Sequence, residues 1–172
     1  MARGFSLIEL MIAMVVLAVG LLGGIMVIGV AKANNGRSKL HTTAVTLAES
    51  TMEKIVAIPR SATAAAAGTT MTDCAGNVFT IQTAPGGSPL IGSGAFAGSV
   101  DFSQPQVPDY SMRYVMCGPG NGAVYDIRWN VDNGPTPSTQ LVTVSAKILS
   151  GNASPAAIFT MPYTLRQYRG DF

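Results

Sequence analysis

The stretch Met1-Ala2-Arg3-Gly4-Phe5-Ser6-Leu7-Ile8-Glu9-Leu10 decides the fold. A four-residue polar leader precedes an apolar run whose one charge is the carboxylate of Glu9. From Leu10 to Ala31 there are 22 residues without a charge. At about 1.5 Å per residue in a helix, this run is long enough to cross a hydrocarbon core about 30 Å thick. The sequence therefore predicts a helix that is inserted in a membrane.

Glu9 is the unusual feature of this helix. A carboxylate costs up to about 2.5–3.5 kcal/mol at the centre of a bilayer and less near its interface, so it requires a partner there. The apolar run itself offers no cation. We therefore expect the partner of Glu9 to belong to another molecule.

The segment Gly4-Phe5-Ser6-Leu7-Ile8-Glu9-Leu10-Met11 resembles the prepilin signal of type IV pilins and of the related type II secretion pseudopilins. The resemblance implies cleavage between Gly4 and Phe5 by a membrane aspartic peptidase, N-methylation of Phe5 and assembly into a helical filament. In that filament Glu9 would pair with the N-terminal amine of a neighbouring subunit. A secretory signal peptide would instead need a small-residue cleavage site after a shorter apolar core. An ordinary single-span anchor needs neither Gly4 nor Glu9.

The remaining chain predicts an α+β fold, in which one long helix packs on a small antiparallel sheet, as the pilin resemblance also implies. Apolar residues recur at three- and four-residue steps before Pro59, which cannot continue a helix. This stripe comprises Leu40, Ala44, Leu47, Thr51, Ile55 and Ile58. The expected parts are a leader (1–4), a membrane or filament-core helix (5–31), an amphipathic helix half (32–58), a loop-rich connection (59–111) and the sheet of the head (112–172).

Two strands are predicted by alternation of apolar and polar residues at 124–131 and 142–148, each with one buried face. The turn residues at 132–137 predict an antiparallel hairpin with a loop longer than two residues. Neighbouring strands are expected at 112–117 and 158–168, where Pro162 favours an edge or a bulge. Trp129 is expected in the core, packed on the helical stripe.

The connecting region is expected to form surface loops. Residues 61–68 are rich in alanine, and residues 84–98 are rich in Gly, Pro, Ser and Ala. A short strand fits between them at 78–83.

Both cysteines, Cys74 and Cys117, follow the membrane segment. With the cytoplasmic leader that the prepilin resemblance implies, they face an oxidising periplasm, which favours a Cys74–Cys117 disulfide. Two free buried thiols or half of a metal site are the alternatives. A metal site is disfavoured because the single histidine, His41, lies on the helix and not at ligand spacing.

Composition argues against several functional classes. The formal net charge is +2, and +1 once Arg3 is removed with the leader, so net charge gives no support for nucleic-acid binding. One histidine and five scattered aspartates before Asp171 do not form a catalytic set, so we expect no enzyme, cofactor or metal. Asp132-Asn133, with Asp126 or Asp101, is interpreted as a solvated turn and not as a calcium site.

The pattern favours a minor pilin of a type IV pilus, acting in filament assembly, initiation or surface adhesion. A minor pseudopilin of a type II secretion system is the closest alternative within the family, and a major pilin is the third. A membrane-anchored binding module that never polymerises is the alternative from another class. The implied partners are other pilin subunits, the prepilin peptidase and methylase, and the inner-membrane assembly platform. The implied location is the bacterial inner membrane, with the head in the periplasm, and then a surface pilus or a periplasmic pseudopilus.

Overall fold

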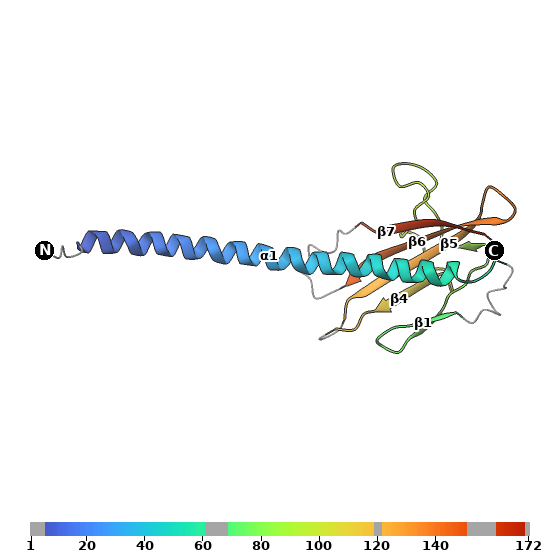
Figure 1. The fold of residues 1–172 in the computed structure, drawn as a ribbon, viewed down its shortest axis with the longest axis horizontal. Helices are drawn as coiled ribbons and strands as arrows, with labels where there is room; N and C mark the ends of the chain where they lie inside the picture. The colour runs from blue at the N-terminus through green and yellow to red at the C-terminus, as the bar shows by residue number, and fades with distance from the viewer. Residues whose placement is uncertain (1–5, 61–68, 119–121, 151–160, 171–172) are drawn as a thin grey trace. The chain divides into compact units, whose positions relative to one another are not determined.

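The computed structural model describes residues 6–60, 69–118, 122–150 and 161–170. The chain divides into two compact units, Met1–Ser38 and Lys39–Phe172. The elements are α1 (Leu7–Val56), β1 (Thr70–Thr72), β2 (Val78–Thr80), β3 (Gly86–Gly87), β4 (Ser111–Val115), β5 (Val124–Asn133), β6 (Thr139–Ser150) and β7 (Tyr163–Gly170). The α+β class, with one long helix and antiparallel sheets, is confirmed (Figure 1).

The main sheet of the second unit is antiparallel and five-stranded. Strands β5, β6 and β7 are consecutive neighbours, while β3 and β4 pair with different parts of β5. The β5–β6 hairpin and its loop at residues 134–138 agree with the prediction from the turn residues. β7 lies at an edge of the sheet and begins directly after Pro162, as that proline favours. Residues 158–160 and 61–68 lie outside the described residues.

The second half of α1 lies across one face of this sheet (Figure 1). The predicted helical stripe is confirmed, since five of its six members are buried and Leu40 packs against the core. Trp129 is fully buried in the same cluster as Leu47 and Ile55. Its indole Nε1 donates to the Gln82 carbonyl at 2.8 Å, so the polar atom of this core aromatic is satisfied.

The sequence prediction that β5 and β6 each bury only one face is wrong, because the face opposite α1 is buried as well. Asp126, Arg128 and Asn130 on β5 are 4–8% exposed, and Thr143 and Ser145 on β6 are at most 1% exposed. The connecting segment covers this face: Asn130 Nδ2 donates to the Ser88 carbonyl at 3.0 Å, and Arg128 Nη1 donates to the Gln104 carbonyl at 2.6 Å. Alternation predicted which side chains share a face, but it carries no information about what covers that face.

Residues 84–98, expected to form a surface loop, in fact contribute β3 and the fully buried Ser88 to this cover. Gly87 pairs with Asn130 at a φ of +126°, and a Cβ there would lie 2.6 Å from the Trp129 carbonyl oxygen. Only glycine fits so close an approach of two backbones.

A small second sheet joins β1 to β2 as an antiparallel pair. The short strand that fitted at 78–83 is present as β2, over Val78–Thr80. Its partner β1 was not predicted, since three residues are too short a run to show a period.

Candidate functional site

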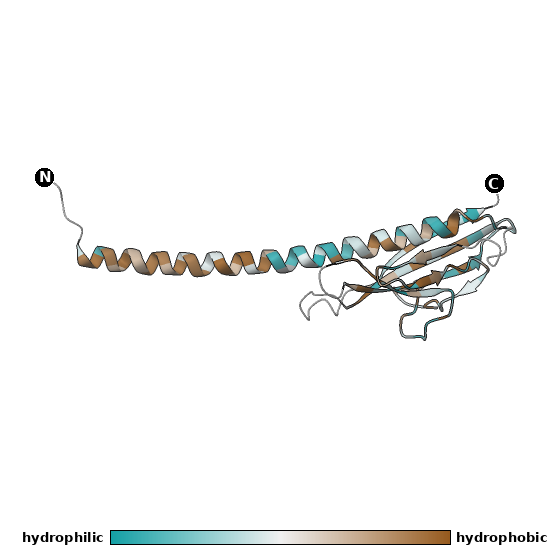
Figure 2. Ribbon diagram, turned by 90° about the horizontal axis from the view of Figure 1, so that it is seen from below, coloured by the Kyte–Doolittle hydropathy of each residue, from teal (hydrophilic) through white to brown (hydrophobic). Residues whose placement is uncertain are grey.

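The helix of the first unit is hydrophobic along most of its length, as the brown ribbon in Figure 2 shows, and its large apolar residues are exposed. The large apolar residues between Leu7 and Val30 are 54–79% exposed. An 18-residue window here has a mean hydropathy of 2.8 and no buried share, and the helix is long and apolar enough to cross a membrane. Since so much apolar surface is unstable in water, this segment requires lipid or other helices around it.

Glu9 lies in the first turn of this helix. The Ser6 carbonyl accepts hydrogen bonds from the backbone N–H groups of Glu9, at 3.0 Å, and Leu10, at 3.2 Å, so Ser6 stands at the N-cap position and Glu9 is the third helical residue. Ser-x-x-Glu is the spacing of a capping box, a signal that the sequence analysis missed. A carboxylate here is also favoured by the positive end of the helix dipole. Gly4 and Phe5 lie outside the described residues.

Cys74 and Cys117 are joined by a disulfide in the structure, with their Cα atoms 5.2 Å apart. Cys74 follows β1 and Cys117 follows β4, and the Cys74 backbone N–H donates to the Val115 carbonyl at 3.0 Å. The bond therefore ties the small sheet to the β4 edge of the main sheet.

Asp73, next to this bond, gathers hydrogen bonds on its carboxylate. Its Oδ1 accepts from the backbone N–H groups of Ala75 and Asn77, and its Oδ2 accepts from Asn77 Nδ2 and the Val115 backbone N–H. Burial raises the pKa of this carboxyl, but the hydrogen bonds from Asn77, Val115 and Ala75 outweigh it and hold the pKa below the usual 3.8. Asp73 thus stabilises the turn that carries Cys74.

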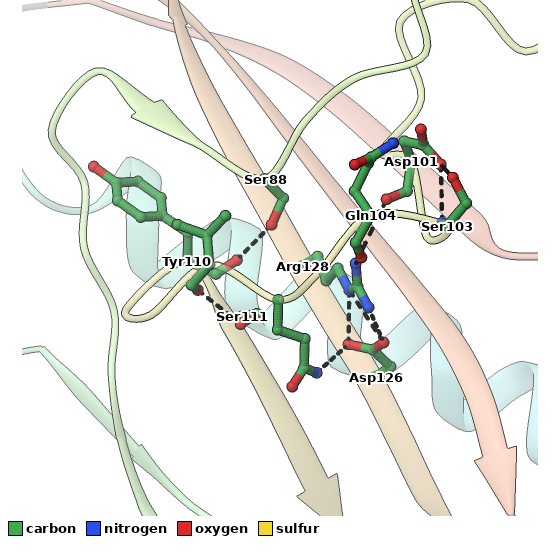
Figure 3. Close-up of polar contacts among 10 residues, drawn as sticks. Ser88, Asp101, Ser103, Gln104, Tyr110, Ser111, Asp126 and Arg128 are labelled. Carbon is green, nitrogen blue, oxygen red and sulfur yellow. Dashed lines mark hydrogen bonds and ion pairs between the residues drawn. The ribbon is translucent and has the colours of Figure 1, made fainter.

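Asp126 and Arg128 form a buried ion pair on the covered face of the sheet (Figure 3). Arg128 Nη2 lies 2.8 Å from Asp126 Oδ2, and Arg128 Nε lies 3.1 Å from both carboxylate oxygens. Gln106 Nε2 donates to Asp126 Oδ1 at 2.9 Å. Residues two apart on a strand share a face, so the Asp-x-Arg spacing was a signal that could have indicated this pair.

The part of the connecting segment that covers the sheet is held in place by contacts of Asp101 and Phe102. The Ser103 hydroxyl and backbone N–H donate to Asp101 Oδ1 at 2.6 and 2.9 Å, and these bonds hold the pKa of Asp101 below its usual value. The Arg128 guanidinium lies 5.0 Å from the centroid of the Phe102 ring, and Lys147 Nζ lies 5.7 Å from it. These contacts clamp the segment to the sheet.

The acidic residues considered as calcium ligands are used differently. Asp126 is paired with Arg128, whereas Asp132 is exposed at the end of β5. Within the described residues, no three His, Cys, Asp or Glu side chains gather in a way that could hold a metal ion.

The architecture and the N-terminal segment together define a class. A long apolar N-terminal helix whose second half packs on an antiparallel sheet is a pilin-like arrangement. Residues 1–30 match the family model described as the prokaryotic N-terminal methylation motif, which is the type IV pilin and pseudopilin signature. This motif implies processing by a prepilin peptidase and assembly with other pilins. No curated protein and no solved structure matches the chain.

Proposed function

We propose that the chain is a minor pilin of a type IV pilus, a structural subunit that acts in filament assembly, initiation or surface adhesion. The match of residues 1–30 to the methylation motif is the observation that carries this proposal. Cleavage between Gly4 and Phe5 and N-methylation of Phe5 precede assembly. Before it, the helix anchors the subunit in the inner membrane with the head in the periplasm, and the Cys74–Cys117 bond suits that oxidising compartment.

The exposed apolar helix supports a mechanism of polymerisation by helix packing. Its side chains exchange lipid for the same surface of neighbouring subunits as the filament forms. Glu9 then sets the axial register, because its carboxylate attracts the N-terminal amine of the adjacent subunit much more strongly at low dielectric than in water. A partner that supplies the amine offsets the desolvation of the carboxylate.

Substitution of Glu9 tests this mechanism against the local capping role that its position also allows. Glu9→Gln removes the charge and keeps the size of the side chain, whereas Ser6→Ala removes the N-cap hydroxyl and keeps the carboxylate. The proposal expects Glu9→Gln to be lost from sheared, purified filaments while it still accumulates in the membrane with a folded head. Ser6→Ala should be incorporated at close to the wild-type level.

Three results would contradict the proposal. Recovery of Glu9→Gln in filaments at the wild-type level would exclude the pairing mechanism, whereas absence of the wild-type chain from filaments would favour a membrane-anchored module that never polymerises. Equal loss of Glu9→Gln and Ser6→Ala would assign Glu9 to helix capping alone. Amino-terminal sequencing of the mature chain provides a separate check, since it must begin at a methylated Phe5.

A further inference from the structure

A groove of about 320 Å³ lies within the second unit, between α1 and β7. Met52 is 4% exposed and Leu165 is partly buried, so the floor of the groove is apolar. The two charged side chains on the helical rim are Glu49 and Glu53, both exposed. The full lining comprises Glu49, Met52, Glu53, Leu165, Arg166 and Gln167.

The strand side of this groove is an edge of the sheet. In the described part of the chain β7 pairs with β6 alone, and no main-chain hydrogen bond joins residues 163–168 to any other segment. An antiparallel edge strand turns half of its N–H and C=O groups away from its neighbour, where they can pair with an added strand. The β4 edge differs, because the Cys74 backbone and the Asp73 carboxylate already bond to Val115 there.

The charge along the groove is acidic and unbalanced. Glu49 and Glu53 are one helical turn apart, a spacing at which like charges repel each other. Among the described residues neither of them forms an ion pair. Arg166 does not supply the missing cation, since its guanidinium lies against Gly98, where an added Cβ would be 2.7 Å from Nη1. Arg166 is in register with Thr143 and Asn130, on the face of the sheet that is turned away from α1.

We propose that the β7 edge binds an extended basic segment of a partner polypeptide as an additional antiparallel or parallel strand. Every second residue of that segment is Lys or Arg. The aliphatic stems of these residues lie on Met52 and Leu165, and their charged ends reach Glu49 and Glu53. Four residues of helix advance by about 6 Å and two residues of strand by about 6.6 Å, so successive basic side chains match the two carboxylates. β7 runs lengthwise along the second half of α1 (Figure 1).

The test uses the full chain in neutral detergent micelles and a labelled, end-blocked peptide with the sequence Val-Lys repeated four times. Fluorescence anisotropy should detect binding that weakens as salt is added. The double variant Glu49→Gln with Glu53→Gln should lower the affinity by about five- to twentyfold, as expected for two exposed ion pairs. The matched control, Asp109→Asn with Asp132→Asn, removes the same charge elsewhere in the second unit and should bind within about twofold of wild type. Unchanged affinity in the Glu49 and Glu53 variant would overturn the proposal.

Main-chain pairing is tested with two further peptides, one N-methylated at every valine and the other at every lysine. Alternate N–H groups of an extended strand point to opposite edges, so one of these peptides should lose binding and the other should retain it. Retention by both would exclude an added strand. If the peptide does not bind, and the chain instead associates with itself in sedimentation in a way that the Glu49 and Glu53 variant abolishes, a second copy occupies the edge and the proposal is wrong. Glu9→Gln should bind the peptide like wild type, which separates this site from filament assembly.

Discussion

Arg169, in the last strand, donates from Nη1 to the main-chain carbonyl of Ile55 at 3.0 Å, across 114 residues of sequence. The same nitrogen lies 3.4 Å from the Ile58 carbonyl, and the other donors reach the Thr83 carbonyl and Gln140 Oε1. The last carbonyls of a helix have no partner within it, and a cation is favoured at that end of the helix dipole. The buried guanidinium of Arg169 therefore joins the end of α1 to the sheet.

Arg169→Met is expected to lower the free energy of unfolding of the head by about 3–5 kcal/mol, because several buried acceptors lose their donor at once. Arg169→Lys keeps the charge but not the planar fork, so its effect should be smaller. Urea unfolding followed by the fluorescence of Trp129, the single tryptophan, measures both. Arg113→Met, at an exposed residue of β4, is the control and should change stability by less than about 0.5 kcal/mol. A cost below about 1 kcal/mol for Arg169→Met would contradict the capping role.

The ion pair between Asp126 and Arg128 is expected to be strongly coupled. Arg128→Met leaves a buried carboxylate without its cation and should cost about 3–5 kcal/mol, and Asp126→Leu should cost a similar amount. The double variant should be more stable than either single variant, since apolar side chains replace both charges. A double-mutant cycle of unfolding free energies measures this, with a coupling of at least about 2 kcal/mol expected. Additive costs would mean that the two residues act separately.

The helix and the long strands could be predicted from the sequence, because their apolar residues recur at a regular spacing. The irregular connecting segment that covers the second face of the sheet could not be predicted. The apolar stripe from Ala44 to Ile58 has a helical period, and the residues around Trp129 alternate between apolar and polar. These two patterns predict that the stripe packs against the apolar face of the strands. Ser88 and Gln104 lie in Gly-, Pro- and Ser-rich sequence, whose composition indicates loops in general. Ser88 and Gln104 are held by hydrogen bonds from their carbonyls to side chains 42 and 24 residues away, and no local pattern encodes such contacts.

The residues of the candidate site also differ in whether the sequence alone could indicate them. Glu9 stands out because a charge in an apolar run is costly, which is a local property of the sequence. Asp73 has no such signal, because its hydrogen bond to Val115 joins segments 42 residues apart. Glu49 and Glu53 fall outside the apolar stripe of the helix, and only the position of β7 shows that they border a groove.

The Cys74–Cys117 bond is expected to stabilise the head by about 4 kcal/mol, the chain-entropy value for the 43-residue separation of the two cysteines. Cys74→Ser with Cys117→Ser should lower the urea midpoint accordingly, with little change in the slope of the transition. Mass spectrometry of the protein isolated from cells without reductant should show no alkylated cysteine. Two alkylated thiols in the untreated protein would show that the bond does not form in the cell.

Asp73 should make the stability of the head depend on acid pH. Its pKa in the folded state lies below the ordinary value of 3.8, so its contribution is fully present above about pH 5 and is lost as the pH falls through the folded-state pKa. Asp73→Asn should therefore cost about 1–3 kcal/mol at pH 7, through weakened hydrogen bonds to Asn77 and Val115, and progressively less below pH 4. Unfolding free energies from pH 7 to pH 2 measure the difference from wild type. The control Asp132→Asn removes an exposed carboxylate and should show a small difference at every pH. A cost of Asp73→Asn that stays constant to pH 2 would show that the carboxylate charge has no part in holding this turn.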